Sequence, residues 1–199
     1  MARKVSITPE IILQNALEMV IDEGYQALSV HSLAKKIGCS TQPIVWHFEN
    51  MEGLRIKLYE YALLSLKDGK EYKSGADAFE NMGSSYVETA IKKPNLFKFL
   101  YLGEGPVSKP YSLSEITTGK DKEELVIKIS EELGLTQKQT VKVIQNTIVF
   151  SHGIATMIAT GVFKTTKKDA MKLIKDASEA YKQSDAEDII DEEFKDEEL

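Results

Sequence analysis

The side chains best suited to do chemistry lie close together in residues 41–47. They combine an amide, a hydroxyl, an imidazole and two apolar rings: Thr41, Gln42, Pro43, Trp46 and His47. The amide of Gln42 can pair with adenine through two hydrogen bonds, and Thr41 and Pro43 can meet the methyl group of thymine. We therefore expect these residues to contact base edges in the major groove of double-stranded DNA.

Groups able to hold DNA phosphates flank this segment. Ser29 and Ser40 precede expected helices, and the free amides in the first turn of a helix bind anions. Basic side chains supply further counterions, with Arg3 and Lys4 on an arm that can reach the minor groove. These basic candidates are Arg3, Lys4, Lys35, Lys36, Arg55 and Lys57.

Two short helices must position these groups. Ser29 is expected to cap a helix with Leu33 and Ala34 inward, and Gly38 to end it, because glycine readily adopts a positive φ. Ser40 is expected to begin the next helix, where Pro43 falls in the first turn and costs no hydrogen bond. Residues 28–54 therefore predict a helix-turn-helix, whose second helix enters the major groove.

Other interpretations remain open at this point. Short helices joined by glycine also build ordinary bundles, and residues 1–60 hold six basic and seven acidic side chains. Phe48 is expected in the core with Leu33 and Ile37, whereas His47 is equally compatible with a packed and an exposed position.

Apolar residues at intervals of three and four indicate an all-α fold throughout the chain. Thr8 and Pro9 begin a first helix that Gly24 ends, and Asn50 caps a helix that runs to about residue 70. A long loop is expected at 103–119. The further expected helices lie at 77–92, 94–102, 121–133, 137–160 and 166–182.

The net charge depends strongly on where it is counted. The chain of 199 residues has a net charge of −6, of which residues 184–199, with nine acids and Lys195, contribute −8, leaving +2 for the other 183. A nearly neutral body binds DNA only if its few basic groups share a face. We predict a DNA-binding domain at 5–65, a helical ligand-binding and dimerisation domain at 66–183, and an acidic, disordered tail at 184–199.

Composition also limits the class of protein. A single cysteine excludes an intramolecular disulfide and a thiolate metal cluster. The lack of an apolar signal peptide and of a run of ~18 apolar residues predicts a cytoplasmic protein that does not enter a membrane. No phosphate-cradling glycine loop and no histidine at a suitable spacing from a nucleophile are found, so we expect neither an enzyme nor a cofactor.

Residues 8 to about 60 resemble the N-terminal domain of the tetracycline-repressor (TetR) family. The likeness rests on Gly24-Tyr25, Leu33-Ala34, Gly38 and Trp46-His47-Phe48. It implies a transcriptional regulator, and more narrowly a repressor, that binds a dyad operator as a homodimer. Residues 151–161 are similar to the penultimate, dimer-forming helix of some members.

Two positions depart from the family pattern. Val45 stands where a phosphate-binding tyrosine is usual, and Met51 where a lysine is usual. The loss of these two phosphate contacts predicts that the operator is bound more weakly, or that Lys35, Lys36 and Arg55 contact the phosphates instead. A protein-interaction module that has lost operator binding and acts through its acidic tail is the alternative.

The resemblance also implies a small-molecule effector that enters the second domain and moves the fourth helix. Apolar walls with a few hydroxyl and imidazole groups suit a mostly apolar ligand. The candidate ligand contacts are Phe79, Met82, Tyr86, Phe97, Tyr101, Phe150, His152 and Met157.

The dimer surface is expected on two apolar stripes, although each stripe can also face the core of its own chain. The stripes consist of Val141, Ile144, Ile148, Ala155 and Ile158, and of Ala170, Leu173, Ile174 and Ala177.

Overall fold

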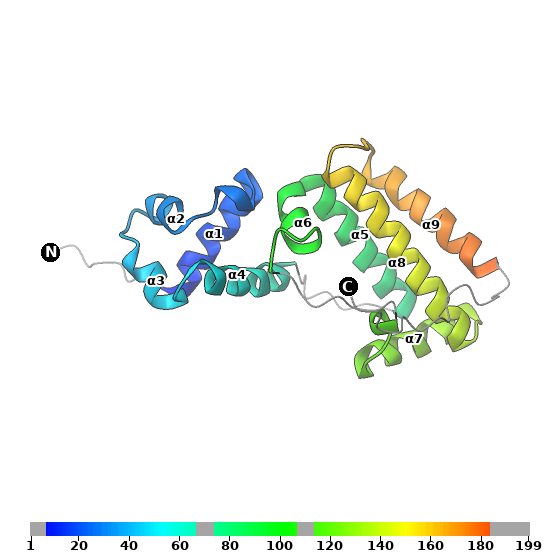
Figure 1. Ribbon diagram of the computed structural model, residues 1–199. Coiled ribbons are helices and arrows are strands. Elements are labelled where there is room, and N and C mark those ends of the chain that lie inside the picture. Colours follow the sequence, from blue (N-terminus) through cyan, green and yellow to red (C-terminus); the bar gives the residue numbers. More distant parts are fainter. Residues whose placement is uncertain (1–6, 67–73, 107–113, 184–199) are drawn as a thin grey trace, which may run out of the picture.

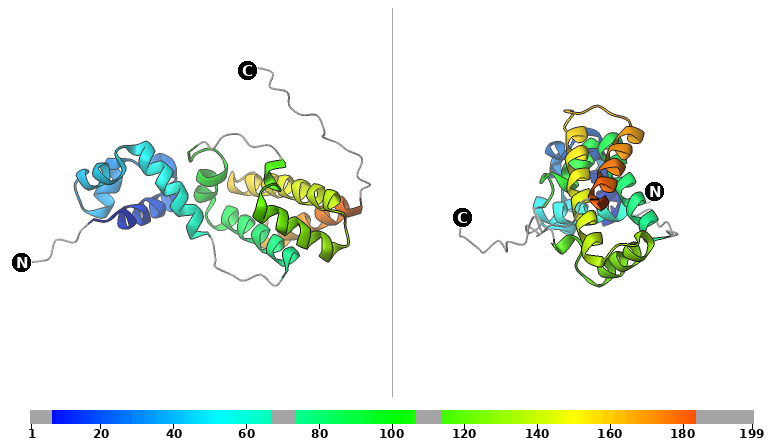
Figure 2. Two further views of the ribbon diagram at one scale, coloured as in Figure 1. Left: turned by 90° about the horizontal axis from the view of Figure 1, so that it is seen from below. Right: turned by 90° about the vertical axis from the view of Figure 1, so that its right-hand side faces the viewer.

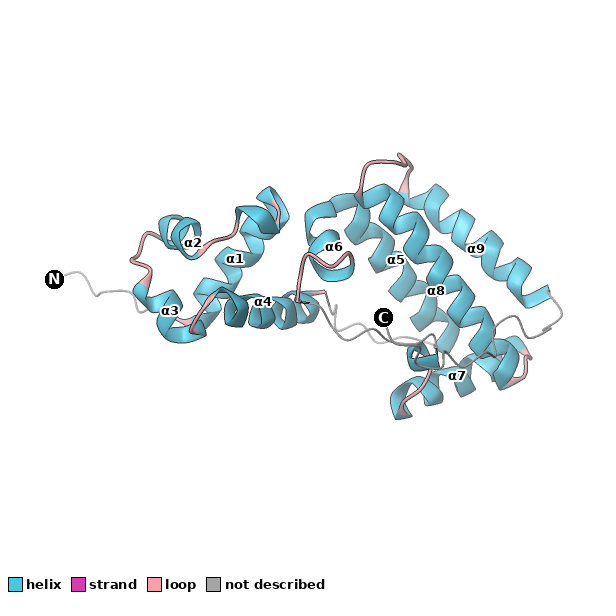
Figure 3. Ribbon diagram, viewed as in Figure 1, coloured by secondary structure: helices cyan, strands magenta, loops and turns pink. Residues whose placement is uncertain are grey.

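The computed structural model describes residues 7–66, 74–106 and 114–183, without the side chains of residues 76–82 and 116. Helices connected by loops make up this part of the chain, which has no strand (Figure 3). The elements are α1 (Pro9–Glu23), η1 (Tyr25–Ala27), α2 (Val30–Ile37), α3 (Gln42–Phe48), α4 (Met51–Ser65), α5 (Gly75–Lys92), α6 (Pro94–Tyr101), η2 (Ser114–Ile116), α7 (Lys120–Leu133), α8 (Gln137–Ala159) and α9 (Lys167–Gln183). The prediction of an all-α fold is confirmed.

The helices α1, α2 and α4 begin at the caps that the sequence predicts. The hydroxyl of Thr8 accepts from the N–H of Ile11 over 3.4 Å, and Pro9 occupies the first turn of α1. Ser29 and Ser32 form a reciprocal capping box at the start of α2. The Asn50 side chain accepts from the N–H of Gly53 over 3.0 Å and caps α4. Each cap satisfies an amide that has no acceptor within its helix.

Several expected boundaries are wrong. α4 ends at Ser65 rather than near residue 70, because the N–H of Leu66 turns back to the carbonyl of Leu63 and tightens the last turn. α3 begins at Gln42, with Thr41 rather than Ser40 before it. The loop expected at 103–119 contains the short helix η2.

The helices α1 to α4 enclose a core to which α6 also contributes. Ile12, Leu33 and Leu54 are fully buried, together with Phe99 from α6. Figures 1 and 2 both place α1 to α4 at one end of the molecule and α6 between them and the remaining helices. Because α6 shares this core, a displacement of α6 must disturb the packing of α1 and α4.

The second part of the molecule is built on α5, α8 and α9, which lie side by side (Figure 1). Val87 of α5, Ile154 of α8 and Ala170 of α9 meet in one buried cluster. α7 covers the end far from α1 to α4, where Val126 and Ile129 pack on Ile144.

The structure places part of the two apolar stripes in the core of the single chain, which is the other position that the sequence left open for them. Four of their residues are buried within the single chain, because α5, α6 and α7 already cover that side of α8 and α9: Ile144, Ala155, Ala170 and Ile174. Leu173 of α9 is exposed, as are Val149 and Met157 of α8. Among the described residues, no helix combines the length and apolar character needed to cross a membrane.

Candidate nucleic-acid interface

Gly38 makes the turn that sets α3 against α2. Its φ of 76° and ψ of 35° lie in the left-handed region, and the N–H groups of Gly38 and Cys39 both donate to the carbonyl of Ala34 over 3.0 Å. A Cβ at this position would meet no atom within 4 Å, so the backbone conformation alone favours glycine.

α3 turns one face into the core and the other toward solvent. Ile44 and Phe48 are buried, whereas Val45 is 47% exposed and Trp46 is 80% exposed. Gln42 is exposed beside them, and Thr41 and Pro43 are half-buried. An indole left this open contributes little to the core of the chain.

In the sequence, Val45 stands out only because it replaces a tyrosine that usually contacts phosphate. In the structure it lies on the exposed face of α3 with Gln42 and Trp46. We call these three residues the reading face. Its polar groups are the amide of Gln42 and the indole N–H of Trp46, and the rest is apolar, so it can meet base edges but carries no charge for phosphates.

His47 is tied to the start of α1. Its Nε2 donates to the carbonyl of Ile7 over 3.1 Å, and its ring lies 4.9 Å from that of Trp46. The side chain is half-buried, which decides between the two positions that the sequence left open. His47 therefore links α3 to the residues just before α1 through its Nε2.

The basic side chains around α3 differ in whether they are paired with a carboxylate. Lys35 is exposed and forms no ion pair with the described residues, whereas Lys36 lies 3.3 Å from Glu18. Arg55 lies 3.4 Å from Glu52, and its guanidinium sits over the ring of Tyr25. Exposed ion pairs are weak and exchange readily for a phosphate.

Other groups of the predicted interface serve local structure or lie outside the described residues. The hydroxyl of Ser29 caps α2, Ser40 is exposed in the turn, and Lys57 lies 2.9 Å from Glu60. Arg3 and Lys4 lie outside the described residues.

Four of the residues expected to hold a ligand do come together between α5, α6 and α8. The ring of Tyr86 lies 4.7 Å from that of Tyr101 and 5.0 Å from that of Phe97. The hydroxyl of Tyr86 and Nδ1 of His152 form a hydrogen bond over 2.5 Å. Burial lowers the pKa of His152 and raises the pKa of Tyr101. We call these four side chains the aromatic cluster.

The remaining ligand candidates lie elsewhere. Phe150 is half-buried against Val87 and Ile154, and Met157 is 42% exposed on α8. Phe79 and Met82 belong to α5, but their side chains are not among those described. The rings of the aromatic cluster pack directly on one another, and a role in ligand binding stays a prediction.

The fold and the turn at Gly38 define a helix-turn-helix protein with a second, helical domain. Residues 12–58 match the family described as bacterial regulatory proteins, tetR family. This match confirms, for the N-terminal domain, the resemblance to the tetR family that the residues around Gly38 and Trp46 predict.

A curated relative supports the same placement. The chain is 24% identical over 102 residues to the uncharacterized HTH-type transcriptional regulator YobS of Bacillus subtilis (strain 168). This match covers 49% of the chain and 53% of YobS, so the chain spans about half the length of that relative.

Two solved structures from Rhodococcus are similar over most of the chain. A putative TetR-family transcriptional regulator from Rhodococcus sp. has a TM-score of 0.53 at 12% identity, covering 88% of this chain and 98% of that one. A TetR transcriptional regulator from Rhodococcus sp. RHA1 has a TM-score of 0.47 at 14% identity, covering 85% and 91%. The first of these two extends the likeness in fold to the second domain.

Proposed function

We propose that this protein is a transcriptional repressor that binds a dyad operator in double-stranded DNA as a homodimer and releases it when a small, mostly apolar molecule binds its second domain. The reading face carries this proposal. Gln42, Val45 and Trp46 are exposed on a helix whose opposite side is anchored by Ile44 and Phe48. A rigid helix with one free face is the element that a helix-turn-helix inserts into the major groove.

Two copies are needed for useful affinity. α3 has seven residues and presents three of them, which is too little surface for tight binding by one chain. Two reading faces about 34 Å apart would contact successive turns of the same face of DNA. The exposed apolar side chains Val149, Met157 and Leu173 support a dimer through α8 and α9.

Release by a ligand requires an element shared by both domains, and α6 meets this requirement. Leu96, Phe99 and Leu100 of α6 pack in the core of α1 to α4, while Phe97 of the same helix packs in the aromatic cluster. A ligand that prefers one arrangement of α6 by ~1 to 3 kcal/mol would change DNA affinity about five- to 150-fold.

Selection from random duplexes tests the proposal directly. The full chain should enrich a motif with dyad symmetry, and binding to that motif should weaken steeply as salt concentration rises. Gln42→Ala should relax the preference at one base position in each half-site, whereas Gln14→Ala, an exposed glutamine on α1, should leave the motif unchanged. Enrichment of no motif would reject the repressor and favour a protein-interaction module.

A further inference from the structure

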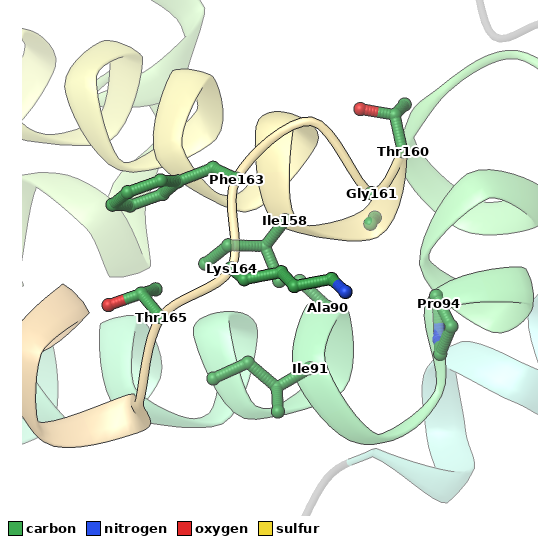
Figure 4. A pocket seen from close by; sticks show the side chains of 10 residues that line it. Ala90, Ile91, Pro94, Ile158, Thr160, Gly161, Phe163, Lys164 and Thr165 are labelled. Atoms are coloured by element: carbon green, nitrogen blue, oxygen red, sulfur yellow. The ribbon is translucent and has the colours of Figure 1, made fainter.

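A pocket of about 380 Å³ lies where the junction of α5 and α6 meets the loop between α8 and α9 (Figure 4). Its volume falls in the lower part of the range of small-molecule sites, and the hollow is open to solvent over much of its surface. The pocket does not include any member of the aromatic cluster or any residue predicted to hold a ligand. Its lining consists of Ala90, Ile91, Pro94, Ile158, Ala159, Thr160, Gly161, Phe163, Lys164 and Thr165.

The floor and one wall of this pocket are apolar. Ala90 and Ile91 come from the last turn of α5, and Ile158 and Ala159 from the last turn of α8. Figure 4 shows Ile91 and Ile158 on facing sides of the space. These surfaces would cover a hydrocarbon or aryl group and remove it from water.

Lys164 supplies the charge at the pocket. Figure 4 shows its side chain lying across the space, with the ammonium group toward Pro94. Lys164 forms no ion pair with the described residues. Its aliphatic stem can remain on the apolar wall while the ammonium group binds an anion.

The surroundings of the pocket favour an anion as well. Residues 88–94 and 164–169 together hold five lysines against two acids, Glu88 and Asp169. Glu88 already bonds Lys167 and Lys92, each at 2.5 Å, and these bonds lower its pKa to about 2. Asp169 bonds the hydroxyl of Thr166 over 2.7 Å. The charge of Glu88 is thus compensated by two lysines, and neither acid forms an ion pair with Lys164 in the described part of the chain.

The pocket touches the element that links the two domains. Pro94, which lines it, is the first residue of α6. The next residue, Asn95, donates its side-chain N–H to the carbonyl of Ile21 near the end of α1 over 3.2 Å. Leu96 then enters the core of α1 to α4. A molecule bound in contact with Pro94 could therefore change how α6 packs against the DNA-binding domain.

We propose that this pocket binds a small amphipathic carboxylate, with its apolar part on Ile91 and Ile158 and its carboxylate on Lys164, and that its occupation weakens DNA binding through α6. The site itself stands on the geometry of the pocket. The effect on DNA rests on the function proposed above, so binding and DNA release are measured separately.

Calorimetric titration of the full chain without DNA tests the site. The probes are hexanoate, octanoate, decanoate and phenylacetate, with octanol as the uncharged counterpart of octanoate. At least one carboxylate should bind saturably at one site per chain, and more tightly than octanol. Lys164→Gln should weaken that binding about tenfold. Lys168→Gln, an exposed lysine that does not line the pocket, should not. Saturable binding by none of the probes, or equal weakening by both substitutions, would overturn the site.

The same probe is then added to the complex with selected DNA. Bound carboxylate should lower the affinity for DNA at least about fivefold in the wild type, and the same concentration should have a smaller effect in Lys164→Gln. Carboxylate binding with unchanged DNA affinity would overturn the link through α6. Failure to select any DNA would instead reject the repressor, while the calorimetric result would still decide the site.

Discussion

The side-chain amide of Asn95, the second residue of α6, donates to the main-chain carbonyl of Ile21 near the end of α1 over 3.2 Å. Gly24 lies beside this bond, and a Cβ on Gly24 would come within 3.7 Å of the Asn95 side chain. The bond joins residues 74 positions apart in the sequence. It is a polar link between the DNA-binding domain and the helix that borders the pocket, next to the apolar contact of Leu96 and Phe99 with the same core.

We predict that Asn95→Ala lowers the free energy of unfolding by about 1 kcal/mol, because the carbonyl of Ile21 loses a partly buried donor. Urea denaturation followed by circular dichroism measures this change. The matched control is Asn15→Ala. Asn15 also donates its amide to a carbonyl, that of Ile11, but within α1, where alanine has the higher helix propensity. Equal destabilisation by both substitutions would show that the bond between α6 and α1 contributes no more to stability than the bond within α1.

Two glycines should respond in opposite ways to alanine. Gly38→Ala should destabilise the protein by about 1 kcal/mol or more, because its φ of 76° is strained for any residue with a Cβ. Gly83 lies inside α5, and a Cβ added to it would meet no atom within 4 Å. Gly83→Ala should therefore stabilise the protein by about 0.5 to 1 kcal/mol.

Thermal unfolding of the two alanine variants beside the wild type gives both signs in one experiment. A gain of stability for Gly38→Ala would mean that the turn between α2 and α3 adopts another backbone conformation. Such a result would remove the basis for the orientation of the reading face.

The apolar part of the reading face predicts a dependence on thymine methyl groups. The exposed side chains of Val45 and Trp46 are largely hydrocarbon and carry no charge. In the selected operator, replacement of thymine by uracil removes only the C5 methyl group. DNA affinity should fall about fourfold for each methyl group that these side chains cover.

Fluorescence anisotropy with the two forms of one operator measures this effect. Trp46→Ala should bind both forms with more similar affinities than the wild type does. Ile56→Ala removes an exposed apolar side chain from α4 and should keep the wild-type ratio. Equal affinity of the wild-type protein for both forms would assign base reading to Gln42 alone.

The parts of the fold that the sequence could predict are those determined by interactions between residues close together in the chain. Thr8, Ser29 and Asn50 each bond an amide three residues ahead, so the start of each helix is determined within a few positions. Gly38 likewise ends α2 through its own φ. These local interactions, together with apolar periodicity, suffice to predict a helix-turn-helix.

The parts that sequence could not predict depend on distant residues. Periodicity shows that Ile144 and Ala155 lie on an apolar face, but not that α7 and α5 cover it within one chain. The bond from His47 to Ile7 spans 40 positions, and no spacing in the sequence brings these two residues together. The pocket joins the end of α5 to the loop after α8, and no spacing in the sequence brings Ile91 and Lys164 together.

The aromatic cluster predicts how stability depends on pH. Burial lowers the pKa of His152 below its ordinary value of 6.5, and Nδ1 of its ring forms a hydrogen bond with the hydroxyl of Tyr86. As the pH falls below about 6.5, the unfolded chain therefore takes up a proton at this histidine before the folded chain does. The free energy of unfolding should fall as pH drops through this range, until the folded histidine is protonated as well. At higher pH both states are neutral at His152 and its contribution no longer changes.

Urea denaturation at several pH values on either side of about 6.5 measures this dependence. His152→Gln keeps a polar side chain that does not titrate, so it should flatten the decline at low pH relative to the wild type. His31→Gln replaces an exposed histidine on α2 and should keep the wild-type decline. The decisive comparison is between these two variants, since both lose one histidine but only His152 is shielded from water. If the free energies of unfolding of the two variants depend on pH in the same way, protonation of His152 does not cause the loss of stability at low pH. The proposal that His152 is neutral in the folded chain would then be rejected.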